Sequence, residues 1–270
     1  MRYGRNGMKQ YAPLSKNHQR WVKKLHQKKY RCEERAFIAE GTNALSEAVN
    51  TGLYGIKEIV IARGVSASLL KMLPRHLPIY ECSERDMKSI STEETPQGVL
   101  TICHQREAVL NNLSNNAPDL MLYLDRIADP GNLGTIIRTA AWFNIDKMIL
   151  SPSCVDPFNP KVIRASAGSI FRTEIFQSIE AETLFRFAEN NNYKLIATAP
   201  KGGTSVHQIK GDKKKIVLLG QEAGGLSKDI MKYADEIVSI EGKGRVESLN
   251  LAVAAAIILY ELSIMSDKTR

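Results

Sequence analysis

The 270-residue chain lacks the patterns that mark several common kinds of site. Its four cysteines form no C-x-x-C pair and have no histidine at a ligand spacing, so we expect neither a metal site nor a disulfide framework. No strand is followed by G-x-G-x-x-G, and there is no P-loop and no G-x-S-x-G elbow. These absences disfavour a nicotinamide or nucleotide enzyme of the Rossmann type, a P-loop NTPase and an α/β hydrolase.

Long apolar runs are also missing. The longest, Leu251 to Tyr260, is about half of what a membrane span needs. The first residues are polar and lack the apolar core of a signal peptide. We therefore expect a soluble, cytoplasmic protein that does not enter a membrane.

Acidic residues are absent from the first 31 positions. This stretch holds ten of the lysines and arginines, and because the net charge of the chain is +8, the rest carries −2. Tyrosines and a tryptophan are interleaved with these charges, at Tyr3, Tyr11, Trp21 and Tyr30. A basic, aromatic segment suits a polyanion such as RNA, although a solvated tail and helix face has the same composition.

The first half of the chain predicts a small α/β unit. We expect a basic amphipathic helix over Lys16 to Arg31, because Trp21, Val22 and Leu25 recur among charges. Short strands follow at FIAEG, IKEIVIA and GVLTI, with helical segments between them. These patterns predict a basic arm over residues 1–15, an RNA-binding α/β domain over 16–103 and a polar, Asn-rich linker over 104–118.

The second half, residues 119–270, alternates strands and helices more regularly. Six short apolar strands are separated by helical patterns, which is typical of a parallel sheet covered on both faces. The last helix, expected over Leu249 to Ser263, is apolar nearly all round. It should therefore lie in the core or in a subunit interface. The fold class is α/β in both parts.

Three loops at strand ends in this half are rich in glycine and polar residues. They read DRIADPGNLGTIIRTA from Asp125, QEAGGLS from Gln221 and EGKGRVESLN from Glu241. Each opens a helix and exposes backbone N–H groups, which suits a polar ligand. Each alone is also an ordinary turn, with Ser248 as a helix N-cap. Three at the same end of one sheet favour a ligand site.

Together these loops resemble the motifs of the SpoU branch of the SPOUT methyltransferases, also called the TrmH family. The residues that match are Asn132, Gly134, Arg138 and Thr139 in the first motif, Gly220, Glu222, Gly225 and Leu226 in the second, and Ile240, Val246, Ser248, Leu249 and Asn250 in the third. The first half resembles the ribosomal-protein-like substrate-binding domain that often precedes this unit.

The resemblance implies a deep trefoil knot, a homodimer and S-adenosylmethionine bound in the knot largely by backbone groups. Carried over residue by residue, the donor contacts are Gly220, Ile240 and Leu249, with Thr198 and Ala199 nearby. Two positions depart from the family pattern. Glu241 stands where proline is usual, and Ala223 stands where glycine is frequent.

The implied reaction is methylation of a ribose 2′-hydroxyl, with ribosomal RNA favoured and transfer RNA as the alternative. Arg138 is a base in the family's proposed mechanism, but arginine stays protonated. Holding the target phosphate and stabilising the developing alkoxide suits it better. Asn132, Glu222, Ser248 and Asn250 are expected to position Arg138, the ribose or the donor. A non-catalytic RNA-binding or ribosome-assembly protein on the same fold is the competing interpretation.

Overall fold

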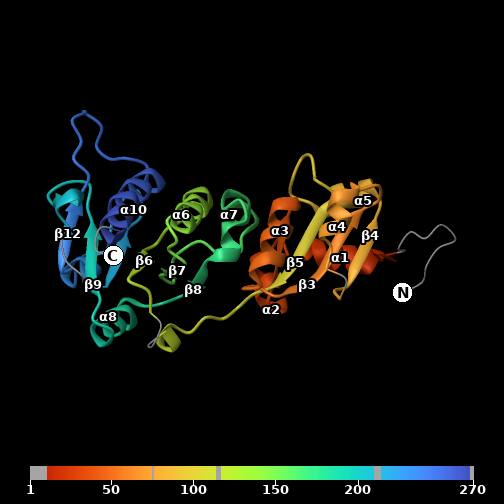
Figure 1. Cartoon of the computed structure of the whole chain (residues 1–270), viewed down its shortest axis with the longest axis horizontal. Helices are drawn as coiled ribbons and strands as arrows, with labels where there is room; N and C mark the ends of the chain where they lie inside the picture. Colours follow the sequence, from red (N-terminus) through yellow and green to blue (C-terminus); the bar gives the residue numbers. More distant parts are fainter. Residues whose placement is uncertain (1–10, 75, 114–116, 210–213, 268–270) are drawn as a thin grey trace. The chain divides into compact units, whose positions relative to one another are not determined.

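A computed structural model describes residues 11–74, 76–113, 117–209 and 214–267. The chain forms two compact units (Figure 1). The first contains the chain up to Arg106 together with the later segment Phe158–Phe171, and the second contains residues 107–157 and 172–270. Within the described ranges, no helix has the length and apolar character needed to cross a bilayer.

The first unit is built on a five-stranded mixed sheet with the order β1-β4-β3-β5-β2. β5 runs antiparallel to β2 and β3, and the other pairs are parallel. Its elements are β1 (Ala12–Pro13), α1 (Lys16–Lys24), α2 (Lys28–Glu34), β2 (Ala36–Glu40), α3 (Thr42–Thr51), β3 (Ile56–Ala62), α4 (Ala67–Met72), β4 (Ile79–Cys82), α5 (Glu84–Ile90), β5 (Val99–His104) and α7 (Pro160–Ala165).

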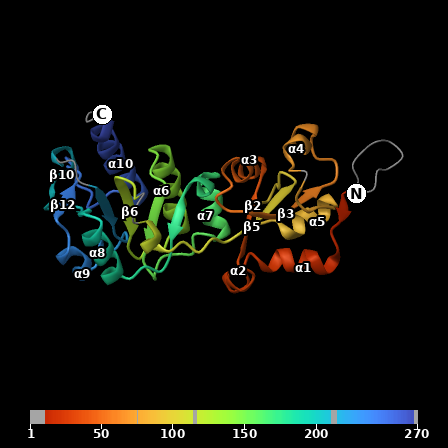
Figure 2. The same cartoon turned by 60° about the horizontal axis from the view of Figure 1, so that its bottom comes forward.

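Both faces of this sheet are covered, because successive strand residues point to opposite sides. Val60 and Ala62 of β3 belong to a cluster that includes Val22 of α1 and Met87 of α5. The intervening Ile59 and Ile61 pack in a second cluster with residues of α3 and α4. Figure 2 shows α1 and α5 together and α3 and α4 on the opposite side of the strands.

The single helix predicted over Lys16 to Arg31 is wrong, because the structure divides it into α1 and α2. The break is stabilised by Arg31, whose side chain is buried. Its Nη1 donates to the carbonyl oxygens of Leu25 at 3.0 Å and His26 at 2.7 Å. These carbonyls lie just past the end of α1, where helical partners are missing, and the guanidinium satisfies them. A helical pattern of charged residues in the sequence cannot show that one of these residues, Arg31, has its side chain buried.

The segment Phe158–Phe171 joins the first unit through aromatic packing. Phe158 and Phe171 both stack on Phe37 of β2, with ring-centroid distances of 4.6 Å and 6.1 Å. Tyr54 meets both phenylalanines of the segment edge to face. A stretch that lies in sequence between two strands of the second unit, β7 (Lys147–Leu150) and β8 (Glu174–Phe176), therefore contributes to the core of the first.

The second unit is built on a seven-stranded sheet with the order β10-β12-β9-β11-β6-β7-β8. Every neighbouring pair is parallel, which confirms the parallel sheet. Its elements are the 3-10 turn η1 (Leu110–Leu113), β6 (Leu120–Leu124), α6 (Pro130–Trp142), β7 (Lys147–Leu150), β8 (Glu174–Phe176), α8 (Ala181–Asn190), β9 (Lys194–Thr198), β10 (Thr204–Ser205), the turn η3 (Val206–Gln208), β11 (Lys215–Leu219), α9 (Lys228–Lys232), β12 (Glu236–Ser239) and α10 (Leu251–Asp267). The turn η2 (Ser169–Arg172) lies almost wholly in the segment of the first unit, which ends at Phe171.

Helices cover this sheet on both faces. Met121 and Tyr123 of β6 pack in a cluster with residues of α8 and α9, and the intervening Leu122 and Leu124 are also buried. The last helix, α10, packs against α6. Leu110 and Ala117, from the segment predicted as a linker, are buried in the cluster under α8.

Candidate active site

The polar loops of the second unit gather at one edge of its sheet. β12, β9 and β11 are neighbours and parallel, so the residues that follow them, Ile240, Ala199 and Gly220, lie at the same carboxyl edge. β6 is the next strand, and its loop leads through Asp129 into α6. The carboxyl edge of a parallel sheet is where α/β proteins bind their ligands.

Hydrogen bonds join the three loops through their polar side chains. Asn132 Nδ2 donates to Glu222 Oε1, and Asn250 Nδ2 donates to Asn132 Oδ1 at 3.1 Å. Asn132 lies in the first turn of α6, where Asp129 caps the helix by accepting from its backbone N–H at 2.7 Å. Glu222 and Asn250 lie 90 and 118 positions after Asn132 in the sequence, and both form a hydrogen bond with its side chain.

Asn250, not Ser248, caps the last helix. Its Oδ1 accepts from the backbone N–H groups of Ala252 at 2.9 Å and Val253 at 3.3 Å, so the predicted start at Leu249 and the predicted Ser248 cap are wrong. The physical reason is position, because only the residue directly before Leu251 can reach these N–H groups. Ser248 lies in the exposed loop between β12 and α10, which is drawn as a long blue excursion in Figure 1.

Arg138 lies on α6, six residues after Asn132, and is exposed. Its guanidinium has no hydrogen-bond or ion-pair partner among the described residues. Asn132, Glu222 and Asn250, which were expected to position Arg138, the ribose or the donor, bond to one another. Arg138 is therefore available to an external anion.

Gly220 allows a very tight turn after β11. A Cβ atom there would lie 2.1 Å from the carbonyl carbon of Gly225 and 2.2 Å from the nitrogen of Leu226. The turn closes with a hydrogen bond of 2.9 Å from Gly225 N to Gln221 O, and Gly225 has a φ of 60°. Because only glycine admits this approach, Gly220 has a structural role whether or not a ligand contacts it.

Two residues at the end of β6, which sequence reasoning missed, hold this turn. Arg126 Nη2 donates to the carbonyl oxygen of Gly225 at 3.1 Å, and its Nε donates to Asp125 at 3.0 Å. The buried Asp125 also accepts from Ser227 N at 3.2 Å. Arg126 has a φ of 57°, a conformation that is uncommon outside glycine. The only sequence signal was a carboxylate directly after a buried strand.

The residues expected to contact the donor differ in exposure. Gly220 is buried, Thr198, Ala199 and Ile240 are half-buried, and Leu249 is 45% exposed. Thr198 Oγ1 donates to Leu218 O at 2.9 Å, which ties β9 to β11 at this edge. The arrangement offers backbone groups and apolar side chains, and few charges.

The nearby Cys154 is not activated as a nucleophile. Its sulfur contacts Leu124 O and Ile127 N, and burial raises the pKa of its thiol. The thiolate is the reactive form, so this shift works against nucleophilic catalysis. In the described part of the chain, no group of three or more His, Cys, Asp or Glu side chains is placed to hold a metal ion.

Comparison with known proteins identifies the family. The SpoU rRNA Methylase family model matches residues 119–260, which include all three loops. The chain belongs to the SpoU rRNA methylase family. An MRM3-like substrate binding domain matches residues 17–101. These matches confirm the family inferred from the loop residues and the kind of domain expected before it.

Relatives of this SpoU protein extend over nearly the whole chain. The 23S rRNA (guanosine(2553)-2′-O)-methyltransferase RlmP of Bacillus subtilis is 30% identical over 89% of this chain and 93% of its own. The mitochondrial rRNA methyltransferase 3A of Danio rerio is 26% identical over 89% of this chain and 67% of its own. The crystal structure of an AdoMet-bound rRNA methyltransferase from Sinorhizobium meliloti is 31% identical, covers 95% of this chain and 98% of its own, and superimposes with a TM-score of 0.85.

Proposed function

We propose that this protein transfers a methyl group from S-adenosylmethionine to a ribose 2′-hydroxyl of ribosomal RNA in the cytoplasm. The observation that carries the proposal is the Glu222–Asn132–Asn250 chain of hydrogen bonds, because it assembles one polar site from three distant motifs. The relatives named above, which act on ribosomal RNA by name, support this substrate over transfer RNA.

The carboxyl edge of the sheet suits S-adenosylmethionine. In the turn at Gly220, backbone atoms of Gly225 and Leu226 lie within 2.4 Å of the position that a Cβ atom of residue 220 would take. Main-chain groups are therefore the contacts that this turn can offer to the donor. Ile240 and Leu249 add apolar surface, and Thr198 and Ala199 complete the proposed donor contacts. When bound, the donor supplies a methyl group already activated by its sulfonium.

The remaining tasks are to align the ribose oxygen and to stabilise its charge. Arg138 is suited to both, because its exposed guanidinium is unpaired among the described residues and can hold the target phosphate. Asn132, Glu222 and Asn250 keep the three loops in register. The hydroxyl of Ser248, in the exposed loop, is a further hydrogen-bonding group for the ribose. Glu241 replaces the usual proline in that loop and leaves its entrance less constrained.

We also propose that the second unit is knotted. β12 lies near one side of the sheet, between β10 and β9. After it, the chain returns as α10 and packs against α6. A returning segment of this kind supports the trefoil path that the resemblance implies. In this scheme residues 119–270 carry out methyl transfer and residues 16–103 bind RNA. The basic arm, residues 1–15, would assist binding, and its first ten residues lie outside the described part.

A homodimer is the proposed assembly. α10 exposes Val253 and Tyr260, seven residues apart and so on one face, and α6 exposes Trp142 at 84%. Apolar side chains of this size mark interfaces when they cluster. Replacing both α10 residues with arginine should shift the sedimentation mass from dimer to monomer. The same change at the exposed Val49 of the first unit is the matched control.

Mapping 2′-O-methylation on total RNA from cells with and without the gene tests the proposed reaction. We expect one ribosomal RNA site to lose its methyl group and an Arg138→Ala gene to leave it unmethylated. Loss of a transfer RNA methyl group would identify the alternative substrate. Normal methylation everywhere, with no heat of binding of S-adenosylmethionine in calorimetry, would favour the non-catalytic RNA-binding interpretation.

A further inference from the structure

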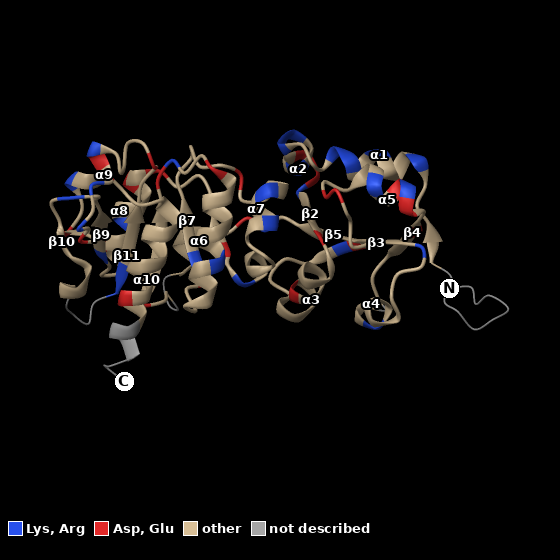
Figure 3. Cartoon of the chain, turned by 90° about the horizontal axis from the view of Figure 1, so that it is seen from above, with Lys and Arg blue, Asp and Glu red and all other residues tan. Residues whose placement is uncertain are grey.

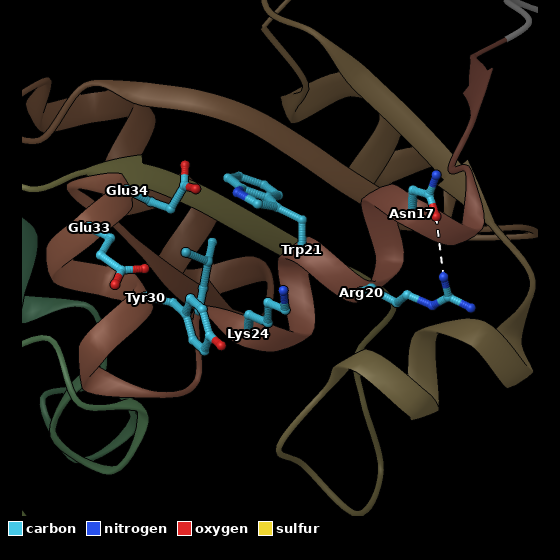
Figure 4. A pocket seen from close by; sticks show the side chains of 8 residues that line it. Asn17, Arg20, Trp21, Lys24, Tyr30, Glu33 and Glu34 are labelled. Carbon is cyan, nitrogen blue, oxygen red and sulfur yellow. Dashed lines mark hydrogen bonds between the residues drawn. The ribbon is translucent and has the colours of Figure 1, made fainter.

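The first unit carries a hollow of about 330 Å³ between α1 and α2, shown in Figure 4. It is remote in sequence from every residue of the candidate active site. Side chains of three kinds line it: cationic and amide groups, two aromatic rings with a leucine, and two carboxylates. They are Asn17, Arg20, Lys24, Trp21, Tyr30, Leu25, Glu33 and Glu34.

The surroundings of the hollow are positively charged. Lysines and arginines are dense along α1 and α2, drawn blue in Figure 3. Arg20 and Lys24 are exposed, and the Arg20 guanidinium donates one hydrogen bond of 3.3 Å to Asn17 Oδ1. Cations of this kind bind phosphates without needing to leave strong internal partners.

The aromatic rings are held in place by the protein. Trp21 packs against the core cluster under α1, with the His18 ring 5.3 Å away, and Lys57 Nζ lies 4.9 Å from its ring centroid. Lys24 Nζ lies 5.1 Å from the ring centroid of Tyr30. Both rings are half-buried and line the hollow, so each presents part of its surface to it. Aromatic surfaces stack with nucleobases.

Glu33 and Glu34 give the hollow a second character. Their internal partners are weak, because Lys29 lies 3.9 Å from Glu33 and Lys57 lies 3.9 Å from Glu34, with all four side chains at least one-third exposed. Such exposed pairs contribute little and exchange readily for other partners. Two carboxylates beside aromatic rings can accept hydrogen bonds from a stacked ligand.

The combination selects against simple ligands. A bare polyphosphate would be repelled by the carboxylates of Glu33 and Glu34, and a basic peptide would be repelled by the cations of Arg20 and Lys24. A nucleotide suits both kinds of group, because its phosphate is anionic and its base offers N–H donors. Guanine alone among the RNA bases presents adjacent imino and amino donors on one edge, which a single carboxylate oxygen pair can accept together.

We propose that this hollow binds one unpaired guanine nucleotide of the RNA substrate, away from the methylated residue. The base stacks on Trp21 or Tyr30 and donates to Glu33 or Glu34, while Arg20 and Lys24 hold the adjoining phosphates. The inference rests on the proposed function in that the protein must act on RNA. It adds the place on the protein where the RNA is bound and the base that is recognised there.

Tryptophan fluorescence gives a direct readout. The chain has two tryptophans, so the full-length Trp142→Phe protein reports on Trp21 alone. Single-stranded RNA decamers with one guanine, or with adenine in its place, are the probes. We expect the guanine decamer to quench Trp21 and to bind roughly tenfold more tightly than the adenine decamer. Equal affinity for both decamers, or quenching by neither, would overturn the proposal.

Charge variants separate the two halves of the recognition. Glu33→Gln with Glu34→Gln should abolish the guanine preference, measured by anisotropy of labelled decamers. Lys24→Ala should weaken both decamers and lower the slope of log affinity against log salt by about 0.7 for one lost phosphate contact. Lys71→Ala, an exposed lysine of α4 outside the hollow, is the matched control and should leave the slope unchanged. A guanine preference that survives in the double glutamine variant contradicts the assignment.

The failure of this site and of the proposed reaction can be told apart. Trp21→Leu should raise KM for RNA by roughly tenfold and leave the affinity for S-adenosylmethionine unchanged. If wild-type protein methylates RNA but Trp21→Leu has an unaltered KM, the hollow is not a binding site. If wild-type protein binds guanine decamers without methylating any RNA, the reaction is wrong and the hollow stands.

Discussion

Replacing Gly220 with alanine should disrupt the turn that carries Glu222. The added Cβ would meet Gly225 C at 2.1 Å, Leu226 N at 2.2 Å and Gly225 O at 2.4 Å. Carbon atoms in contact stay about 3.5 Å apart or more, so the facing backbone must move by over 1 Å. No flexible side chain is available to yield, because all three contacts are main-chain atoms.

The cost follows from what the displaced turn loses. Overpacking of this kind costs about 1–3 kcal/mol. Movement of Gly225 also breaks its hydrogen bonds to Gln221 and Arg126, at about 1 kcal/mol each. We therefore expect about 3–5 kcal/mol of local destabilisation. Hydrogen exchange of peptides covering residues 215–232 measures this quantity directly, because it reports local opening in a protein of two units. Calorimetry should show a loss of S-adenosylmethionine affinity of at least about tenfold, since 1.4 kcal/mol suffices for that factor.

Two other glycines provide matched controls. A Cβ at Gly224 would meet only the far end of the Gln221 side chain, at 2.7 Å, and at Gly242 nothing lies within 4 Å. Alanine at either position should leave exchange in residues 215–232 within about 0.5 kcal/mol of wild type. If Gly220→Ala exchanges and binds the donor like these controls, the close turn and its role at the donor edge are both refuted.

Three further outcomes are expected. Arg138→Ala should fold normally and bind S-adenosylmethionine like wild type, but turn over about 100-fold or more slowly, as measured by methyl incorporation into RNA; near-normal turnover would remove Arg138 from the site. Asn250→Asp should keep the helix cap and lose the donor to Asn132, whereas Asn250→Ala should lose both and unfold about 1 kcal/mol more easily in urea; equal stability of the two would contradict the cap. Burial raises the pKa of the Cys82 thiol from 9.0 to about 11, so its protonated form stabilises the fold below pH 9 and that contribution is lost as pH rises toward 11. Urea unfolding from pH 8 to 11 should show this loss in wild type and a smaller one in Cys82→Ala, and identical pH profiles would contradict it.

The sequence predicted the second unit well, because its signals are local. Short apolar strands alternate with helices, and the buried pattern of β11 or β6 does not depend on distant partners. The pairing of Asn132 with Glu222 and Asn250 is different. Its members were found only through the family motifs, since nothing in the spacing of 90 and 118 residues indicates a contact.

The errors have a common physical origin in tertiary contacts. The helix break at Leu25 depends on the inward-turned Arg31, and a pattern of charges reads that residue as exposed. Arg126 at the end of β6 holds a turn 99 residues later, so its role is invisible in its neighbours. The two-residue strand β10 is too short to carry an alternating pattern.

The inserted segment Phe158–Phe171 means that neither unit is encoded by one continuous stretch of the chain. Because the segment belongs to the first unit but is encoded within the second, the chain passes between them at residues 106, 157 and 171. A fragment that starts at residue 119 would carry Phe158 and Phe171 without Phe37 and Tyr54, the rings against which they pack. The substrate-binding module therefore cannot be exchanged for another by a single cut and join. An evolutionary or engineered swap must bring a compatible surface at the insertion as well.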